Sequence, residues 1–149
     1  MDATRPYILV IDDLADSADS LAELLTLWGY DAEPLYSGST ALEAARTWRP
    51  DAVLLDLGMP RMTGLQFALR FRDVPGCEDT PIVAVTGHHT LRLQAREMGI
   101  DHYLLKPIMD MSHLQELLGR LTATPEPLRL PAGLRRPRTE RRLERCATA

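Results

Sequence analysis

The chain of 149 residues contains only two cysteines, Cys77 and Cys146, too few for a disulfide framework or a zinc site built from cysteine. It has no apolar run long enough to cross a bilayer, since the longest strand-like run covers residues 7–11. Its first residues do not form the apolar stretch of a signal peptide. These absences exclude the membrane, secreted and collagen-like classes, and we expect a cytoplasmic protein without membrane contact.

Lysine is almost missing as well. Sixteen of the 17 basic residues are arginine, and Lys106 is the only lysine. Chance placement is one explanation. The other is a position that needs a compact ammonium group rather than the planar fork of a guanidinium.

The composition that remains, 45% hydrophobic and 26% charged, is typical of a soluble globular domain. Charge is divided along the chain, because residues 1–124 hold 18 acidic and 10 basic side chains, whereas residues 125–149 hold seven arginines and three glutamates. We therefore predict a folded domain over residues 1–123 and a disordered, basic tail rich in proline and arginine over residues 124–149. A short basic helix over residues 138–146 that contacts a partner or nucleic acid is the alternative.

Short apolar runs alternate with segments of helical length, and most of these runs lack the alternation of a half-exposed strand. Strands are predicted at residues 7–11, 32–36, 52–55, 82–85 and 103–105. Apolar residues recur at helical spacing in five segments: Leu14, Ala18, Leu21, Leu25 and Trp28; Ala41, Ala44, Ala45 and Trp48; Phe67, Ala68 and Phe71 within residues 64–73; Leu91, Ala95 and Met98; and Leu114, Leu117, Leu118 and Leu121. This order predicts a doubly wound α/β fold with a five-stranded parallel sheet and five helices. Pro34 cannot donate to a strand ladder, which places its strand at the sheet edge.

Polar residues follow four of these strands. Asp12 and Asp13 come after the first strand, Asp56 after the third, Thr86 at the end of the fourth and Lys106 after the fifth. The carboxyl ends of parallel strands meet at one edge of the sheet, where ligands of such folds bind. We therefore expect three carboxylates, a hydroxyl and an ammonium group to converge there.

These groups indicate phosphoryl chemistry with a divalent cation. Three close carboxylates repel one another unless a cation neutralises them, and hard oxygen donors favour Mg²⁺, or Mn²⁺, over zinc. A lysine and a threonine hydroxyl are suited to phosphoryl oxygens. Without a Ser-His-Asp arrangement or a glycine-rich phosphate loop, the nucleophile is expected to be a carboxylate, and the product an acyl phosphate on Asp56.

Four motifs together resemble the receiver domain of response regulators, the phosphoacceptor of two-component signalling. They are Ile-Asp-Asp at 11–13, Leu-Leu-Asp-Leu-Gly-Met-Pro-Arg-Met-Thr-Gly at 54–64, Val-Thr-Gly at 85–87 and Gly-Ile-Asp-His-Tyr-Leu-Leu-Lys-Pro at 99–107. The resemblance covers about residues 6–122. It implies a flavodoxin-like fold with strand order 2-1-3-4-5.

The resemblance also implies residue roles. Asp56 would be the phosphoacceptor, and Asp12 and Asp13 would hold Mg²⁺ together with Asp56 and the backbone carbonyl of Gly58. Thr86 and Lys106 would contact the phosphoryl group.

The resemblance further implies that the Lys106–Pro107 bond is cis. Tyr103 would be an aromatic switch that turns inward as Thr86 moves toward the phosphate. A strand aromatic that never switches is the alternative for Tyr103. Two positions depart from common choices in the family, Gly58 and His88.

The partners implied are a histidine kinase or a histidine phosphotransfer protein as donor and an unidentified downstream protein. We expect a single-domain regulator that signals through the fourth helix, fifth strand and fifth helix or relays the phosphoryl group, and that does not bind DNA. One alternative is a phosphatase of the haloacid dehalogenase type, although that family has a second acidic residue at the position of Gly58. Another is a nucleic-acid-binding regulator that uses the arginine-rich tail.

Overall fold

The aliphatic runs of the sequence become the strands of one sheet in the computed structural model, which describes residues 5–122. Strands and helices alternate strictly, so that each strand is followed by one helix. In chain order the elements are β1 (Tyr7–Ile11), α1 (Ala15–Leu27), β2 (Asp31–Leu35), α2 (Gly38–Thr47), β3 (Ala52–Leu55), α3 (Gly64–Phe71), β4 (Ile82–Thr86), α4 (Arg92–Glu97), β5 (His102–Leu105) and α5 (Met111–Thr122).

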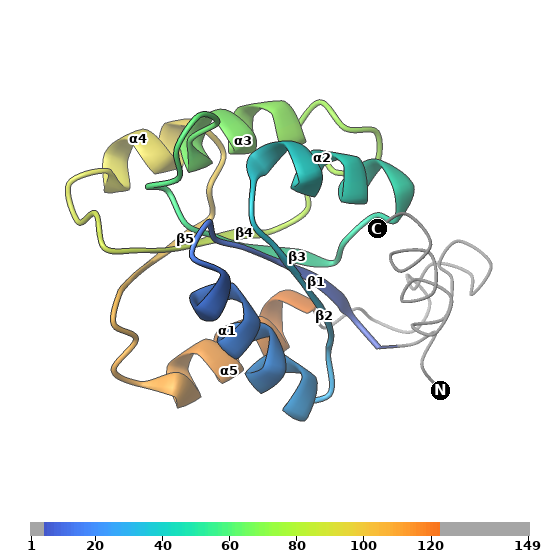
Figure 1. The fold of residues 1–149 in the computed structure, drawn as a ribbon, viewed down its shortest axis with the longest axis vertical. Coiled ribbons are helices and arrows are strands. Elements are labelled where there is room, and N and C mark those ends of the chain that lie inside the picture. The colour runs from blue at the N-terminus through green and yellow to red at the C-terminus, as the bar shows by residue number, and fades with distance from the viewer. Residues whose placement is uncertain (1–4, 123–149) are drawn as a thin grey trace.

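The sheet is parallel throughout, with strand order β2-β1-β3-β4-β5. Helices α2, α3 and α4 cover one face, and α1 and α5 cover the other (Figure 1). The predicted doubly wound, flavodoxin-like fold is therefore confirmed. The strand order changes direction between β1 and β3, and their carboxyl ends lie side by side at this switch point.

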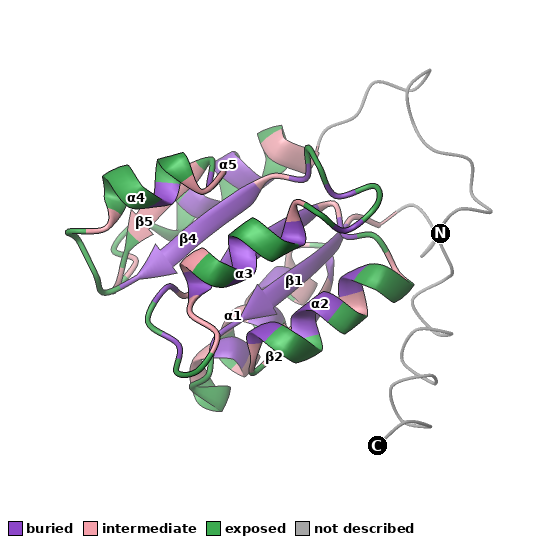
Figure 2. Ribbon diagram, turned by 90° about the horizontal axis from the view of Figure 1, so that it is seen from above, coloured by how far each residue is buried: buried purple, intermediate pink, exposed green. Residues whose placement is uncertain are grey.

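Two apolar cores lie on opposite faces of the sheet because side chains alternate along each strand. On one face Leu9 and Ile11 of β1 pack with Phe67 and Phe71 of α3, whose rings stack with centroids 5.3 Å apart. On the other face Val10 packs with residues of α1 and α5. Strands β1, β3 and β4 are buried along their whole length, whereas the helices keep an exposed outer side (Figure 2).

The edge strands differ from these central strands. β2 contains Pro34 and pairs only with β1, so the predicted edge position is confirmed; the strand covers Asp31–Leu35, one residue earlier than expected. β5 is the opposite edge and is only half-buried.

Leu14 fits the helical spacing of the first segment but does not belong to the buried side of the helix. Leu14 is the N-cap residue that precedes α1 and is 60% exposed, so the apolar side of this helix begins at Ala18. The helix ends at Leu27, and Gly29 just beyond it has a φ of 100°, a conformation that glycine adopts readily.

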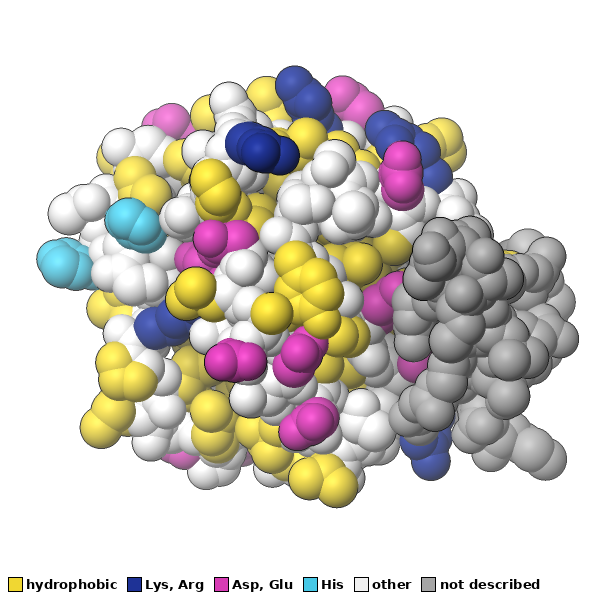
Figure 3. Space-filling model, in the orientation of Figure 1, with side chains coloured by type: hydrophobic (Ala, Val, Ile, Leu, Met, Phe, Trp, Pro, Cys, Tyr) yellow, Lys and Arg dark blue, Asp and Glu magenta, His cyan; other side chains and the backbone are white. Residues whose placement is uncertain are grey.

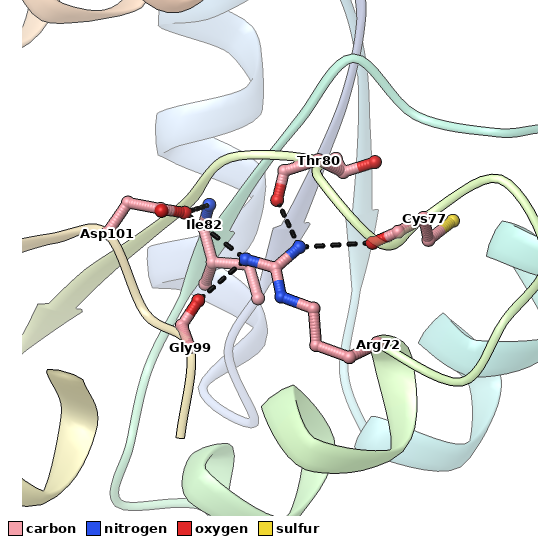
Figure 4. A network of polar contacts seen from close by, with 6 residues as sticks. All are labelled: Arg72, Cys77, Thr80, Ile82, Gly99 and Asp101. Atoms are coloured by element: carbon pink, nitrogen blue, oxygen red, sulfur yellow. Dashed lines mark hydrogen bonds and ion pairs between the residues drawn. The ribbon is translucent and has the colours of Figure 1, made fainter. Parts of the chain in front are cut away.

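At the amino end of the sheet, one arginine connects three separate segments (Figure 4). Arg72 Nη1 donates to the carbonyl oxygens of Cys77 and Thr80 at 3.0 and 2.5 Å, and Nη2 donates to the carbonyl of Gly99 at 2.6 Å and to Asp101 Oδ2 at 3.2 Å. We call these five residues the Arg72 network. It joins the end of α3 to the loops that lead into β4 and β5.

Among the helices of residues 5–122, none combines the length and apolar character that a membrane crossing requires. The segment predicted to be a disordered tail, residues 124–149, lies outside the described residues, as does the alternative helix at 138–146.

Candidate functional site

Three carboxylates meet at the carboxyl end of the sheet, as the strand assignment predicted. Asp12 and Asp13 follow β1, and Asp56 follows β3, the strand next to it. One oxygen from each of the three carboxylates lies within 4.8 Å of the other two. Asp12 is buried, Asp56 is half-buried and Asp13 is exposed, so the cluster opens to solvent on one side.

The only lysine of the sequence directly follows β5 and reaches into this cluster. Lys106 Nζ lies 2.6 Å from Asp12 Oδ2 and 3.8 Å from Asp56 Oδ2. Its peptide bond to Pro107 is cis, as predicted. The ammonium group therefore bridges the carboxylates of two neighbouring strands, and it offsets one of their three negative charges.

Backbone N–H groups orient the carboxylates of Asp12 and Asp56. The N–H of Leu14 donates to Asp12 Oδ1 at 3.0 Å, and the N–H of Gly58 donates to Asp56 Oδ1 at 3.2 Å. In each case one oxygen of the carboxylate accepts from the chain two residues later, a local turn that aspartate favours. The other oxygen of each carboxylate faces Lys106.

Thr86 ends β4 and is fully buried. Its hydroxyl oxygen accepts a hydrogen bond from the N–H of His88 at 3.2 Å, and its backbone carbonyl accepts one from the N–H of Lys106 at 2.8 Å. Thr86 and Lys106 are thereby held together at the carboxyl ends of two adjacent strands, β4 and β5.

Gly58 and His88 lie against each other across this edge. A Cβ atom added at Gly58 would lie 2.5 Å from Nε2 of His88, so the imidazole ring occupies the space that a side chain at position 58 would need. The sequence showed that both positions are unusual, but it gave no indication that they touch. Their contact joins the loops after β3 and β4.

Gly64 is a residue of this site that the sequence analysis did not single out beyond its motif. A Cβ atom there would lie 2.6 Å from the backbone oxygen of Asp56 and 2.6 Å from Cα of Leu57. The chain returns to Asp56 through a loop that ends at Thr63, which forms a capping box with Gln66 at the start of α3. Only glycine allows this close approach, and the approach fixes the backbone that carries Asp56.

Tyr103 is half-buried on β5, and the guanidinium carbon of Arg92 lies 5.1 Å from the centroid of its ring. Within the part of the chain that the structure describes, the buried Tyr103 hydroxyl has no hydrogen-bond partner. An orphaned polar group of this kind costs free energy.

The surroundings of the cluster are acidic and partly apolar. Acidic side chains gather over α1 and over the loop before it (Figure 3), where Asp13 and Asp16 are exposed. A cavity of about 330 Å³ extends from Asp12, Asp56 and Lys106 toward apolar side chains of α1 and of the region after β5.

The donor set fits a hard divalent cation. It offers carboxylate oxygens from Asp12, Asp13 and Asp56 close together, and the described residues place no cysteine among them. The acidic cluster is therefore consistent with a magnesium site.

Comparison with known proteins agrees with this geometry. Residues 8–119 match the family described as the response regulator receiver domain. The response regulator MprA of Mycobacterium ulcerans is 37% identical over 118 residues, which are 78% of this chain and 48% of that protein. The chain thus spans about half the length of the curated relatives that it matches.

Solved structures of receivers superpose on most of the chain. A CheY-like receiver domain from Methylobacillus flagellatus has a TM-score of 0.72 and 33% identity, and covers 79% of this chain and 99% of its own. The response regulator TrrA from Thermotoga maritima, solved in complex with Mg²⁺-BeF, has a TM-score of 0.70 and 28% identity, with 78% of this chain and 98% of its own covered.

The family match covers the acidic cluster and the sheet from Ile8 onward, and it rules out the phosphatase alternative. Strand order, the three clustered aspartates and the lysine that follows β5 all agree with it. The chain therefore belongs to the response-regulator receiver domains, which are phosphoacceptor signalling modules rather than conventional enzymes.

Proposed function

We propose that Asp56 accepts a phosphoryl group from a phosphohistidine of a histidine kinase or a histidine phosphotransfer protein. The observation that carries the proposal is the cluster of Asp12, Asp13 and Asp56 with Lys106 between two of them. In the transfer, a carboxylate oxygen of Asp56 forms a bond to phosphorus as the phosphorus–nitrogen bond of the donor histidine breaks. Because Asp56 reacts as the carboxylate, it loses no proton.

A divalent cation would be held by oxygen atoms of this chain. Asp12, Asp13 and Asp56 would bind Mg²⁺, or Mn²⁺, together with the backbone carbonyl of Gly58. The ion neutralises the charge that accumulates when a phosphoryl group approaches three carboxylates. The Mg²⁺-BeF complex of the relative TrrA supports this assignment.

Lys106 and Thr86 receive the phosphoryl oxygens. Lys106 is 3.8 Å from Asp56 Oδ2, so a small movement away from Asp12 lets its ammonium group pair with a phosphoryl oxygen. The Thr86 hydroxyl accepts from the N–H of His88, and its own proton can be donated to another phosphoryl oxygen.

The downstream protein contacts the surface formed by α4, β5 and α5. Movement of Thr86 toward the phosphoryl group would be coupled to Tyr103, whose buried hydroxyl lacks a partner within residues 5–122. Onward relay of the phosphoryl group is the second use of the same chemistry. The single-domain organisation stays a prediction, because the chain spans about half the length of relatives such as MprA.

The test is the intact mass of the protein after incubation with phosphoramidate and Mg²⁺. We expect one phosphoryl adduct that is labile to base, no adduct on Asp56→Asn, and no adduct when a chelator removes the metal. The circular dichroism spectrum of Asp56→Asn should match that of the wild type. An adduct on the Asn variant would refute the assignment of Asp56, and undiminished labelling with chelator would refute the metal-binding role of Asp12 and Asp13.

A further inference from the structure

A groove lies between α4 and α5, with the edge strand β5 at its base. It encloses about 210 Å³ and is lined by three arginines, two from α4 and one from α5: Arg92, Arg96 and Arg120. All three are exposed. His102 of β5 and His113 of α5 also line its wall. We call this hollow the α4–α5 groove.

The positive charge of the groove is not balanced within its own wall. Asp101 is its one acidic lining residue, and the carboxylate oxygen Oδ2 already accepts from Arg72 and from the N–H of Ile82. Glu97 on α4 and Glu116 on α5 are exposed but do not line the groove.

The rest of the domain makes this concentration of arginine distinctive. Residues 1–124 contain 18 acidic and 10 basic side chains, of which nine are arginine. Three of these nine line one hollow of about 210 Å³. Because guanidinium groups bind carboxylates in a planar, two-pronged geometry, such a wall is complementary to carboxylates on a partner.

The groove is also connected to Tyr103. Arg92 lies over the tyrosine ring, and both residues line the groove next to the apolar side chains of Ala95, Leu104 and Leu117. A ligand that pairs with Arg92 therefore contacts the residue that covers the proposed switch. The apolar base offers a place for one aliphatic side chain of the ligand.

We infer that the α4–α5 groove binds an acidic peptide segment of the downstream protein, with its carboxylates on Arg92, Arg96 and Arg120 and an aliphatic residue on the base. The inference rests on the proposed function, because it specifies the chemistry of the partner that reads the α4-β5-α5 surface. It adds that this partner is recognised through negative charge.

Two other occupants fit less well. Nucleic acid would bring its phosphates against a domain that is acidic overall, which opposes binding. A second copy of this chain would place one arginine-lined groove against another, and like charges repel. Both remain as outcomes of the test.

The experiment uses the full chain labelled with ¹⁵N, before and after treatment with beryllofluoride and Mg²⁺. The probe is a synthetic twelve-residue peptide that alternates Glu and Leu between Gly-Ser ends, and the matched peptide carries Gln in place of Glu. We expect the Glu peptide to shift the side-chain Nε–H signals of Arg92, Arg96 and Arg120 and the amides of β5. The Gln peptide should shift none of them, and binding should weaken as the salt concentration rises.

The matched variants separate local from overall charge. Replacement of Arg92, Arg96 and Arg120 by Gln should weaken binding of the Glu peptide about tenfold, the sum expected for three exposed ion pairs. Replacement of Arg46, Arg49 and Arg70 by Gln removes the same charge from exposed positions elsewhere. That variant should bind within twofold of the wild type.

Several results would overturn the inference: equal shifts with the Gln peptide, equal loss in both triple variants, shifts that fall outside α4, β5 and α5, or the same shifts produced by duplex DNA. Dimerisation in sedimentation that is lost only in the Arg92, Arg96 and Arg120 variant would assign the groove to a second copy. The phosphoryl adduct on Asp56 is measured on the same samples. If the adduct forms but the Glu peptide does not bind the groove, only the inference about the groove fails. If the adduct does not form, the proposed function fails.

Discussion

Replacement of Arg72 by Met should destabilise the domain without changing its phosphorylation. Methionine keeps an unbranched apolar side chain and removes the guanidinium group, whose carbon is 5.9 Å from the centroid of the Phe71 ring. The three carbonyl groups of the Arg72 network then lose their donor, while nothing at the carboxyl end of the sheet is touched.

The size of the effect follows from the contacts. Arg72 is 20% exposed at its side chain, and its bonds to the carbonyls of Cys77, Thr80 and Gly99 measure 3.0, 2.5 and 2.6 Å. Each such bond contributes about 1 kcal/mol net. Asp101 is 47% exposed at its side chain and regains water, so we count its ion pair as close to zero. The free energy of unfolding should fall by about 3 kcal/mol, and the melting temperature by about 10 °C.

The assay is urea unfolding followed by circular dichroism, with the dependence on urea expected to stay unchanged. Arg70→Met, at an exposed position of α3, is the matched control and should change the free energy by less than about 0.5 kcal/mol. A loss below about 1 kcal/mol for Arg72→Met would refute the role given to the network. So would a loss of the phosphoryl adduct in a folded Arg72→Met protein.

Three further predictions concern single residues. Gly64→Ala should lower the free energy of unfolding by about 2 kcal/mol, because the added Cβ would lie 2.6 Å from the backbone oxygen of Asp56. Gly119→Ala, which has open space around it, should raise this free energy by about 0.5 kcal/mol. Equal changes for the two variants in urea unfolding would contradict this prediction. Burial raises the pKa of the Cys77 thiol, so the group stays protonated at pH 8. Iodoacetamide should therefore label Cys77 in the folded protein at least about tenfold more slowly than in the protein unfolded by urea, as measured by peptide mass spectrometry. Lys106→Arg should fold normally but form the phosphoryl adduct more slowly, because a planar fork replaces a point charge; an unchanged rate would argue against its role.

The sequence was sufficient to predict the sheet and the convergence of the charged residues. Buried strands have an aliphatic signature, and the parallel topology brings the residues after each strand to one edge. The position of Asp12, Asp13 and Asp56 within 4.8 Å of one another follows from these two facts. Pro34 predicted the edge strand because proline has no backbone N–H to donate to a neighbouring strand.

The remaining features depend on contacts that leave no local pattern. Arg72 bonds to backbone carbonyls 5 to 27 residues away, and a carbonyl group is present at every position of a chain. Leu14 fitted the helical spacing, but the helix begins after it and the leucine is exposed. The close approach of Gly64 to Asp56 is likewise visible only once the loop between them is folded.

The contact of Gly58 with His88 means that the two positions cannot vary independently. Any side chain added at position 58 must displace the imidazole ring, so the same substitution should have different effects with His and with Ala at position 88. A double-mutant cycle of Gly58→Asn and His88→Ala would express this as a coupling free energy. In a library that randomises the two loops, permitted residues should therefore occur as pairs, and scanning either position alone would underestimate the range of sequences that this site tolerates.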